Sequence, residues 1–427
     1  MEKTLNENKS GIKLVNVLFC VIYLAPILLA INPNLTTISS IIIIGFSIIL
    51  WGSNKFYYIF PLFILFGGEL LLPGDISTYR VFSLLLFFKI IFSKKLTIEK
   101  AILFPFSIII LYCLLVIALY NYTLSFLIIF DLLLIIMYTS TFIRNNITQF
   151  FTYYVFATVS SCVYGWFMQA LNIKTFINID NQWVQVSRFV GSFPDPNYFG
   201  FFINIAIFAV IILNIFRNKS IKIPILIFLY VSLLSTLSIT GFICNVLMLG
   251  VYFALSKKAK IKYILTVLAI GALLFLNLDF LASANYPAIS DAAKRITSQL
   301  SIGTDKDTSA LTTGRSDIWK EHLEYYLQQP ITKILFGGNY VTDAGMEPKF
   351  NNVSHQAYID MLLNFGLLGT LVMILFLIII TLKYVSSYFK TKNEEYLLLV
   401  IIKIIWAFYA FGLSMFPSWK FNLFFFL

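Results

Sequence analysis

The amino-acid sequence predicts an all-α polytopic membrane protein, and two observations carry this prediction. The 427 residues are 59% hydrophobic and only 12% charged, with a mean hydropathy of +0.86. A water-soluble core cannot absorb so much apolar surface. The apolar residues are also grouped in runs long enough to cross roughly 30 Å of hydrocarbon as helices. These runs lack the two-residue alternation of membrane-barrel strands, so helices are the expected spanning structure.

About thirteen such runs are expected, within a range of about twelve to fourteen. They occupy residues 14–31, 36–51, 56–72, 78–93, 101–120, 123–143, 149–171, 197–216, 222–238, 240–256, 260–281, 357–382 and 396–416. Residues 420–427 resemble the start of a further span that is too short to cross, and it is either truncated or lies in the interface. We expect a single transmembrane domain over residues 1–427, with the first span retained because no convincing cleavage site follows it.

The net charge of +11 is explained by membrane topology, and nucleic acid is not an expected partner. More than half of the 31 basic residues lie in alternate connections between the expected spans. Short connections on the other side, such as 73–77 and 121–122, contain none. This distribution follows the positive-inside rule and places the amino terminus in the cytoplasm.

No metal or cofactor is expected. The four cysteines all lie inside expected spans and none forms a CxxC pair, so neither a redox site nor a disulfide framework is indicated. Asp305 and Asp307 flank Lys306 in a Gly/Thr/Ser-rich context, where a solvated loop is the better interpretation. Asp131 and Lys403 lie near the middle of their spans, and we interpret them as a structural ion pair rather than as catalytic groups.

Two long polar segments fall on the outer side of this topology, at 172–196 and 282–356. Chemistry is therefore expected at the outer face. Within the larger segment, "GRSDIWKEHLEYYLQQP" (314–330) has the apolar spacing of a helix that Pro330 ends. This helix either lies at the membrane interface or packs on neighbouring spans. "FGGN" (336–339) predicts a turn.

The stretch "SFPDPNYFGFF" (192–202) marks the start of a span at the outer surface. Asp195 is suited to the N-cap and Pro196 to the first helical position. A helix N-terminus with Arg188 nearby could bind an anion. The alternative is a plain helix start, with Arg188 reaching the interface along its apolar stem.

Three motifs together resemble the O-antigen ligase and polymerase superfamily: "RFVGSFPDPNYFG", "TGRSDIW…PITKILFGGN" and "SHQAYIDMLLNFGLLG". The resemblance covers about 188–370 and the layout of the spans. It implies a membrane glycosyltransferase of GT-C-like architecture in the bacterial inner membrane, a Wzy-type polysaccharide polymerase that uses undecaprenyl-pyrophosphate-linked oligosaccharides as donor and acceptor. It also implies a chain-length regulator protein as a further partner. One departure is "LSITGF" (237–242), where Ile239 replaces an arginine that the family often has.

The resemblance also implies the site residues. His355, Arg315 and Arg188 match the positions used for acceptor activation and pyrophosphate handling. Arg80, Asp195, Asn197 and Gly314 are expected to contribute to substrate binding. Arginine forks match phosphate oxygens and stay charged, and histidine can take a proton near neutral pH. A hydrogen-bonding role remains the alternative for His355, and catalysis by His322 is disfavoured.

Other functions remain open at this point. A ligase of the same superfamily would transfer the chain to a different acceptor. Inverted repeats and broken helices in matching halves would indicate a flippase of lipid-linked oligosaccharide, and the sequence shows neither. A non-catalytic partner of an envelope synthase is disfavoured because Arg188, Arg315 and His355 are all present. Glu69 and Arg80 lie close to the outer ends of adjacent spans, and both could line the cavity.

Overall fold

The computed structural model is mostly helical in the part of the chain that it describes. Two compact units are present, one formed by Met1–Leu96 with Thr141–Thr236 and the other by Thr97–Ser140 with Leu237–Leu427. The described residues are 17–32, 35–93, 107, 110, 111, 114, 124–171, 175–179, 182–186, 189–236, 238–256, 315–337, 356–413, 415 and 419–427.

Every expected span that falls in the described part coincides with helical structure, which confirms the helical fold class. The helices are Val17–Ile27, α2 (Leu28–Ile31), α3 (Thr36–Ile49), the 3-10 turn Asn54–Ile59 with α4 (Phe60–Phe66), α5 (Thr78–Phe92), α7 (Leu124–Thr141), α8 (Ile147–Ala170), α9 (Pro196–Ile212), α10 (Lys219–Ser235), α11 (Ile239–Leu255), α18 (Ala357–Thr391) and α19 (Glu394–Tyr409). The expected spans at 101–120 and 260–281 lie almost entirely outside the described residues.

Helix α18 is the one described helix that is both long and apolar enough to cross a membrane by length and composition. Its most apolar window is only 39% buried, so it is not an enclosed core helix. Several other apolar helices are shorter, among them Thr36–Ile49 and Pro196–Ile212. The number of spans, about thirteen by the length rule, therefore stays a prediction.

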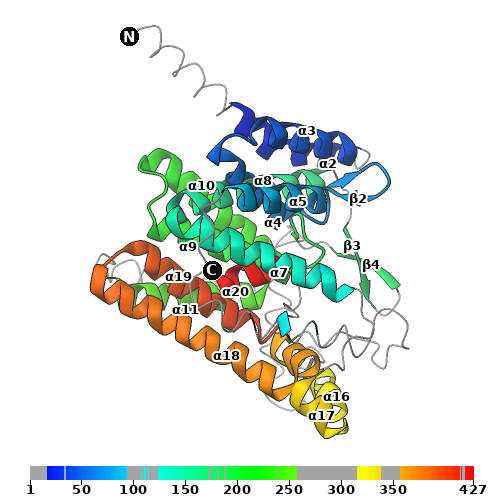
Figure 1. Ribbon diagram of the computed structural model, residues 1–427. Helices are drawn as coiled ribbons and strands as arrows, with labels where there is room; N and C mark the ends of the chain where they lie inside the picture. Colours follow the sequence, from blue (N-terminus) through cyan, green and yellow to red (C-terminus); the bar gives the residue numbers. More distant parts are fainter. Residues whose placement is uncertain are drawn as a thin grey trace, which may run out of the picture. The chain divides into compact units, whose positions relative to one another are not determined.

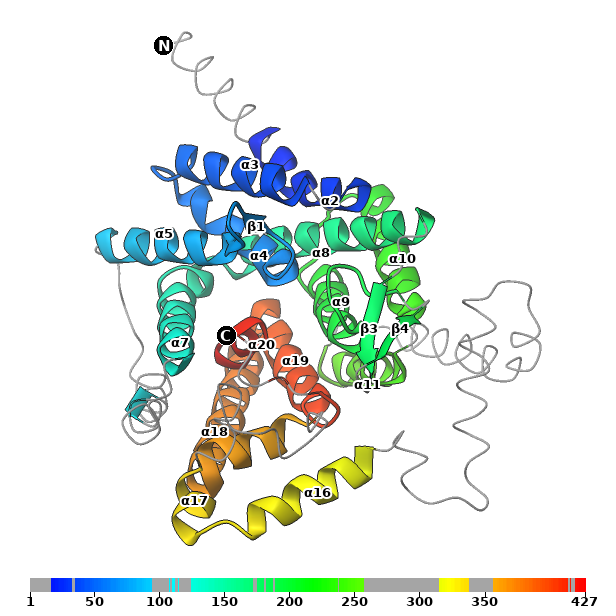
Figure 2. The same ribbon diagram turned by 90° about the vertical axis from the view of Figure 1, so that its right-hand side faces the viewer.

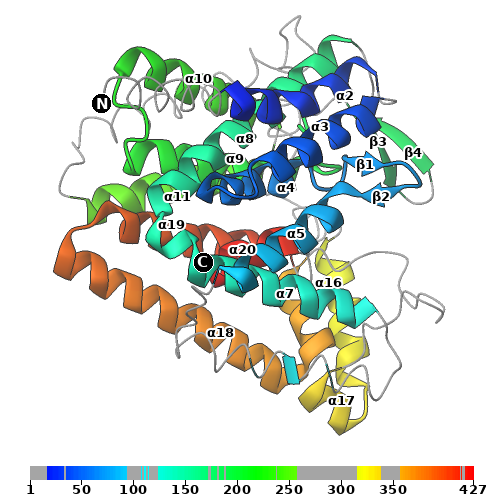
Figure 3. The same cartoon turned by 45° about the horizontal axis from the view of Figure 1, so that its top comes forward.

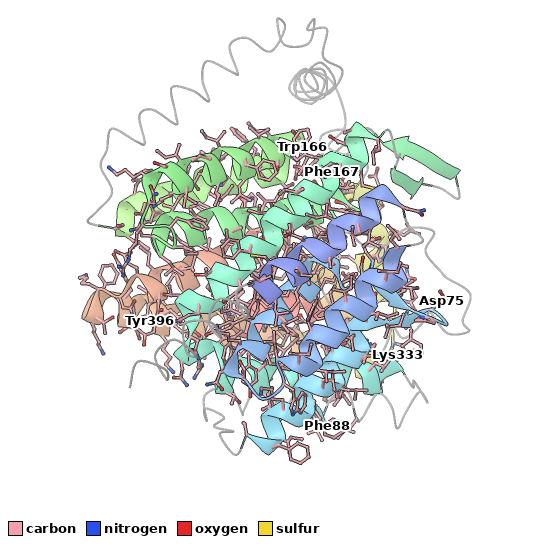
Figure 4. The ribbon with its side chains drawn as sticks, turned by 90° about the horizontal axis from the view of Figure 1, so that it is seen from above. Asp75, Phe88, Trp166, Phe167, Lys333 and Tyr396 are labelled. Carbon is pink, nitrogen blue, oxygen red and sulfur yellow. The ribbon has the colours of Figure 1, made fainter. Side chains whose placement is uncertain are left out.

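In the first unit, α8 is the central helix and contacts α4, α9 and α10. The preceding segments pack through aromatic side chains: the ring of Phe82 on α5 stacks on Phe56 at 5.0 Å and on Phe63 at 4.6 Å. Apolar side chains on the outward faces remain exposed, such as Phe88 on α5 and Phe167 on α8 (Figure 4). An aromatic interior with an apolar exterior is the pattern expected of a protein surrounded by lipid.

In the part of the chain that the structure describes, two β-hairpins interrupt the helical pattern, and the sequence analysis anticipated neither. Strands β1 (Leu71–Leu72) and β2 (Ile76–Ser77) pair across a turn in which Gly74 and Asp75 have positive φ (Figure 3). Strands β3 (Thr175–Ile179) and β4 (Gln182–Val186) pair within the expected outer segment 172–196 (Figure 2). Both hairpins lie between helices, where the backbone is free to form local pairs.

The chain from Phe189 to Asp195 is anchored by close backbone packing. Gly191 has φ of +57°, and a Cβ there would come within 2.8 Å of the Phe199 ring. The Ser192 hydroxyl donates to the carbonyl of Leu65 at 2.8 Å and lies 2.7 Å from the Ser161 hydroxyl. This buried network fixes the turn that leads into α9.

In the second unit, α18 and α19 pack side by side, with α20 (Trp419–Phe426) against them (Figure 1). The ring of Phe425 lies 4.7 Å from Trp406 on α19 and 5.5 Å from Phe376 on α18. Lys403 donates to the carbonyls of Phe424 and Phe425. The segment expected at the interface is therefore buried within the unit, while the expected pairing of Lys403 with Asp131 stays a prediction.

Two short helices precede α18, and glycine makes their packing possible. They are α16 (Arg315–Leu327) and α17 (Ile331–Phe336), separated by Pro330 as predicted. Gly337 follows α17 with φ of +80°, and Gly366 interrupts α18 with φ of +63°. A Cβ on Gly366 would lie 2.5 Å from the Gly337 nitrogen, and a Cβ on Gly337 would lie 2.5 Å from the Gly366 nitrogen. We call this contact the Gly337–Gly366 joint.

The joint gives a direct prediction about stability. Replacing Gly337 or Gly366 by Ala should destabilise the second unit, because both backbones occupy a region that is essentially restricted to glycine, at a cost of about 1–3 kcal/mol each. Steric overlap adds to this cost. Thermal unfolding of the purified protein should show a clear loss of apparent melting temperature.

Gly250 on α11 is the matched control, since a Cβ there meets nothing within 4 Å. Gly250→Ala should be neutral or stabilising by about 0.5–1 kcal/mol, the usual gain of Ala over Gly inside a helix. Equal melting temperatures for Gly366→Ala and Gly250→Ala would contradict the assigned role of the joint.

Candidate functional site

Arg315 is the expected site residue that the structure places most clearly. It is the first residue of α16, is partly buried, and donates from Nη1 to the carbonyl of Gly412 at 3.0 Å. Gly412 lies in the turn that follows α19, residues 410–413, which we call the α19 turn. Because α16 packs on α18 through the cluster of Trp319, Tyr326 and Ile359, the guanidinium is presented to this turn by a fixed scaffold.

The start of α18 is bonded to the same region. The N–H of Ala357 donates to the carbonyl of Ala410 at 2.8 Å, and the Tyr358 hydroxyl donates to the carbonyl of Ala407 at 3.0 Å. The end of α19 is therefore bonded both to the first turn of α18 and to the first residue of α16.

The N-terminus of α11 completes the cluster. Ser238 is its N-cap, and the Ser238 hydroxyl accepts the N–H of Gly241 at 3.0 Å. A Cβ on Gly241 would lie 3.0 Å from the Tyr409 hydroxyl, so the first turn of α11 rests on the end of α19. A Cβ on Gly412 would lie 3.5 Å from Arg315 Nη1 and 3.9 Å from Thr240 Oγ1. The Arg315 guanidinium and the Thr240 side chain at the start of α11 therefore both lie beside Gly412.

The cluster combines a cation with two helix starts, and acidic residues also occur in the first turns of α16 (Asp317) and α18 (Asp360). Arg315 stands at the N-terminus of α16 and close to the N-terminus of α11, and each helix start carries about half a positive charge. Within the described residues, Arg315 has no carboxylate partner and its one hydrogen bond is to a carbonyl. A cation at two positive helix ends lowers its energy by binding an anion. The arrangement is suited to a phosphate group.

His322 on α16 is a buried ionisable group with a structural role. Its side chain is fully buried, and Nδ1 lies 2.8 Å from the carbonyl of Ile318, which requires Nδ1 to carry the proton. Burial lowers the pKa of His322, so the neutral form is favoured. This agrees with the expectation that His322 is not the catalytic histidine.

In the first unit, the structure confirms Asp195 as the N-cap of α9. Its carboxylate accepts the N–H of Asn197 at 2.6 Å and that of Tyr198 at 3.3 Å, and Pro196 occupies the first helical position. The negative charge thus already meets the positive end of α9. The expected roles of Asp195 and Asn197 in substrate binding stay predictions.

Arg80 is partly buried in the first turn of α5, with its guanidinium 5.4 Å from the centroid of the Tyr79 ring. Its expected role in substrate binding stays a prediction. Arg188, His355 and Gly314 lie outside the described residues.

Two members of the cluster were missed by sequence reasoning. Gly412 contributes a backbone carbonyl, and because every residue has one, the residue type gives no signal in the sequence. Thr240 was seen within "LSITGF", but attention fell on the absent arginine at Ile239. The structure instead places the Arg315 guanidinium close to this helix start. Within the described residues, no group of three or more His, Cys, Asp or Glu side chains could hold a metal ion.

Comparison with known proteins agrees with the resemblance in the sequence. Residues 224–374 match the O-antigen ligase family, whose members are integral membrane proteins of the bacterial inner membrane and glycosyltransferase-like enzymes. The matched segment contains α11, Arg315, His355 and both glycines of the joint. No curated protein matches the chain as a relative. The match over residues 224–374 supports the resemblance of this chain to the O-antigen ligase and polymerase superfamily.

Proposed function

We propose that this protein polymerises undecaprenyl-pyrophosphate-linked oligosaccharide repeat units at the outer face of the cytoplasmic membrane. The observation that carries the proposal is the position of Arg315, a cation without a carboxylate partner in the described residues, close to the N-terminus of α11. Undecaprenyl pyrophosphate is a leaving group that must be neutralised as its negative charge grows. Preorganised donors at a developing charge are usually the largest contribution to catalysis.

The proposed step is a single glycosyl transfer. The acceptor hydroxyl attacks the anomeric carbon of the donor chain, and the bond from that carbon to the pyrophosphate oxygen breaks. The leaving undecaprenyl pyrophosphate keeps the electron pair, and Arg315 with the α11 N-terminus stabilises its charge. The hydroxyl proton passes to a base. This mechanism requires no metal ion.

His355 is the proposed base. It precedes Ala357 by two residues, and the Ala357 N–H is bonded to Ala410, two residues before the carbonyl that Arg315 contacts. Two peptide links limit the Cα separation between His355 and Ala357 to about 7.6 Å. Chain connectivity thus supports a place for His355 near the cluster.

Arg188, Arg80, Asp195, Asn197 and Gly314 remain proposed contributors to substrate binding. The capping of α9 by Asp195 supports assigning the pyrophosphate to the start of α11 instead, because the Asp195 carboxylate already accepts the first N–H groups of α9. The α11 N-cap is Ser238, a neutral residue, and no acidic residue lies in the first turn of α11.

A second candidate function is transfer of the chain to a different acceptor, as a ligase does. The matched family is described by ligase activity, which favours this alternative. Both reactions share the donor chemistry and differ only in the acceptor.

Deletion of the gene distinguishes the two functions. Loss of a polymerase should leave surface saccharide as single repeat units. Loss of a ligase should leave chains of normal length that remain attached to the lipid carrier. The second result would replace polymerisation by ligation as the function.

Arg315→Ala should abolish polymer formation, with a loss on the order of 10²–10³ if it matches that of a missing oxyanion donor. Arg315→Lys should recover little, because a point charge cannot reproduce the bidentate fork. Polymer length on a gel, compared at equal protein level, measures both effects.

Lys320→Ala is the matched control on the same helix, since Lys320 is 76% exposed and makes only a surface pair with Glu324. It should leave polymer unchanged. Melting temperature separates catalysis from the structural bond to Gly412. Normal polymer from a stable Arg315→Ala protein would remove Arg315 from the site.

His355→Ala and His355→Gln should each lose a factor on the order of 10²–10⁴, the usual contribution of a positioned base. Only neutral imidazole can accept the proton, so wild-type activity should rise with pH through one ionisation. An ordinary imidazole titrates at about pH 6.5. Initial rates over pH 5–9, a range of about two units either side of neutrality, measure this limb.

His322→Gln is the control, because His322 is the chain's only other histidine. It should keep the acid limb that the His355 variants lose. Near-wild-type turnover by a folded His355→Gln protein would assign His355 a structural role.

A further inference from the structure

Helix α16 packs its aromatic face on α18. Its Trp319, Tyr325 and Tyr326 pack with Ile359 and Leu363 of α18 in one cluster, and the Tyr326 hydroxyl donates to the carbonyl of Ile334 at 2.6 Å. Of the two interpretations left open by the sequence, the packed loop helix is the one that the structure supports. Leu323 and Leu327 near the end of α16 are exposed, and further uncovered apolar side chains follow this helix.

They lie at α17 and around the break in α18. We define the α17 patch as five exposed apolar residues: Leu327, Ile331, Phe336, Leu367 and Leu368. Ile331 and Phe336 are 66% and 51% exposed on a helix of only six residues. Lys333 in the same helix is partly buried. So much exposed apolar surface on a short helix calls for a covering partner.

The patch is continuous with the exposed stripe of α18. Phe336 adjoins Gly337 and Leu367 adjoins Gly366, so both flank the Gly337–Gly366 joint. Beyond the joint, exposed residues recur at helical spacing along α18, at Leu368, Leu371, Leu375, Ile379 and Leu382. Helix α18 is the described helix that is long and apolar enough to cross a membrane, so this stripe is suited to face lipid.

We propose that α17 is a membrane-inserted wedge whose α17 patch lies among the acyl chains of the leaflet adjoining the start of α18. The joint holds α17 against the break in α18, so its side chains extend the lipid-facing surface beyond the axis of the spanning segment. Lys333 lies at the level of the headgroups, where a basic side chain is favoured. The wedge anchors the scaffold of Arg315 to the bilayer surface.

Spin labels in lipid nanodiscs test the wedge. Single cysteines at Ile331 and Phe336, in a background lacking the four native cysteines, are labelled and probed by collision with oxygen and with a water-soluble nickel chelate. Labels at Leu375 and Lys320 serve as the lipid and water references, because Leu375 lies on the exposed α18 stripe and Lys320 is 76% exposed on a charged helix face.

The Ile331 and Phe336 labels should match Leu375, with high collision with oxygen and low collision with nickel. High nickel collision, as at Lys320, would place α17 in water and overturn the proposal. Low collision with both reagents would overturn it in favour of a protein cover, such as a second copy of the chain. High nickel collision at the Leu375 label would show that the exposed stripe of α18 faces water, and would also overturn the proposal. These outcomes are independent of polymer formation, so the proposed enzymatic function stands or falls separately.

Discussion

The backbone contact between Gly337 and Gly366 is the constraint on which the second unit depends. Both residues have positive φ, and neither position has space for a Cβ. The contact lets α17 approach the interrupted part of α18 closely, and α16 then packs its aromatic face on the same helix. Arg315, at the far end of α16, consequently meets the α19 turn at a defined point. The defined position of the Arg315 guanidinium thus depends on glycine at positions 337 and 366.

The placement of charge at the helix starts distinguishes the two units. The positive start of α9 is neutralised by Asp195, whose carboxylate accepts the N–H groups of Asn197 and Tyr198. The start of α11 has a neutral Ser238 cap and a nearby arginine, so its positive potential is reinforced. Such an arrangement costs stability unless an anion is bound, and unfavourable charge of this kind is typical of functional sites.

Sequence reasoning predicted the features that depend on local chemistry. Asp195 and Pro196 identified the start of α9, and Pro330 identified the end of α16. Both signals are local, because an N-cap side chain and the fixed φ of proline act on the backbone within a few residues. The break at Gly366 was missed, since an isolated glycine in an apolar run is compatible with a continuous helix. The partner of the α16 face was also undetermined, because periodicity shows that a face is apolar without showing whether protein or lipid covers it.

The segment that matches the family contains the residues proposed to act on the donor. Residues 224–374 include the start of α11, Arg315, His355 and the joint, which together form the proposed leaving-group and proton-transfer apparatus. Arg80, Arg188 and Asp195 lie before that segment. Ligases and polymerases break the same bond to pyrophosphate and differ in the hydroxyl that attacks. A shared segment is therefore expected to hold the donor half of the reaction, and the choice of acceptor is expected to depend on residues outside it. On this argument, changes before residue 224 should alter which acceptor is used more than they alter cleavage of the donor.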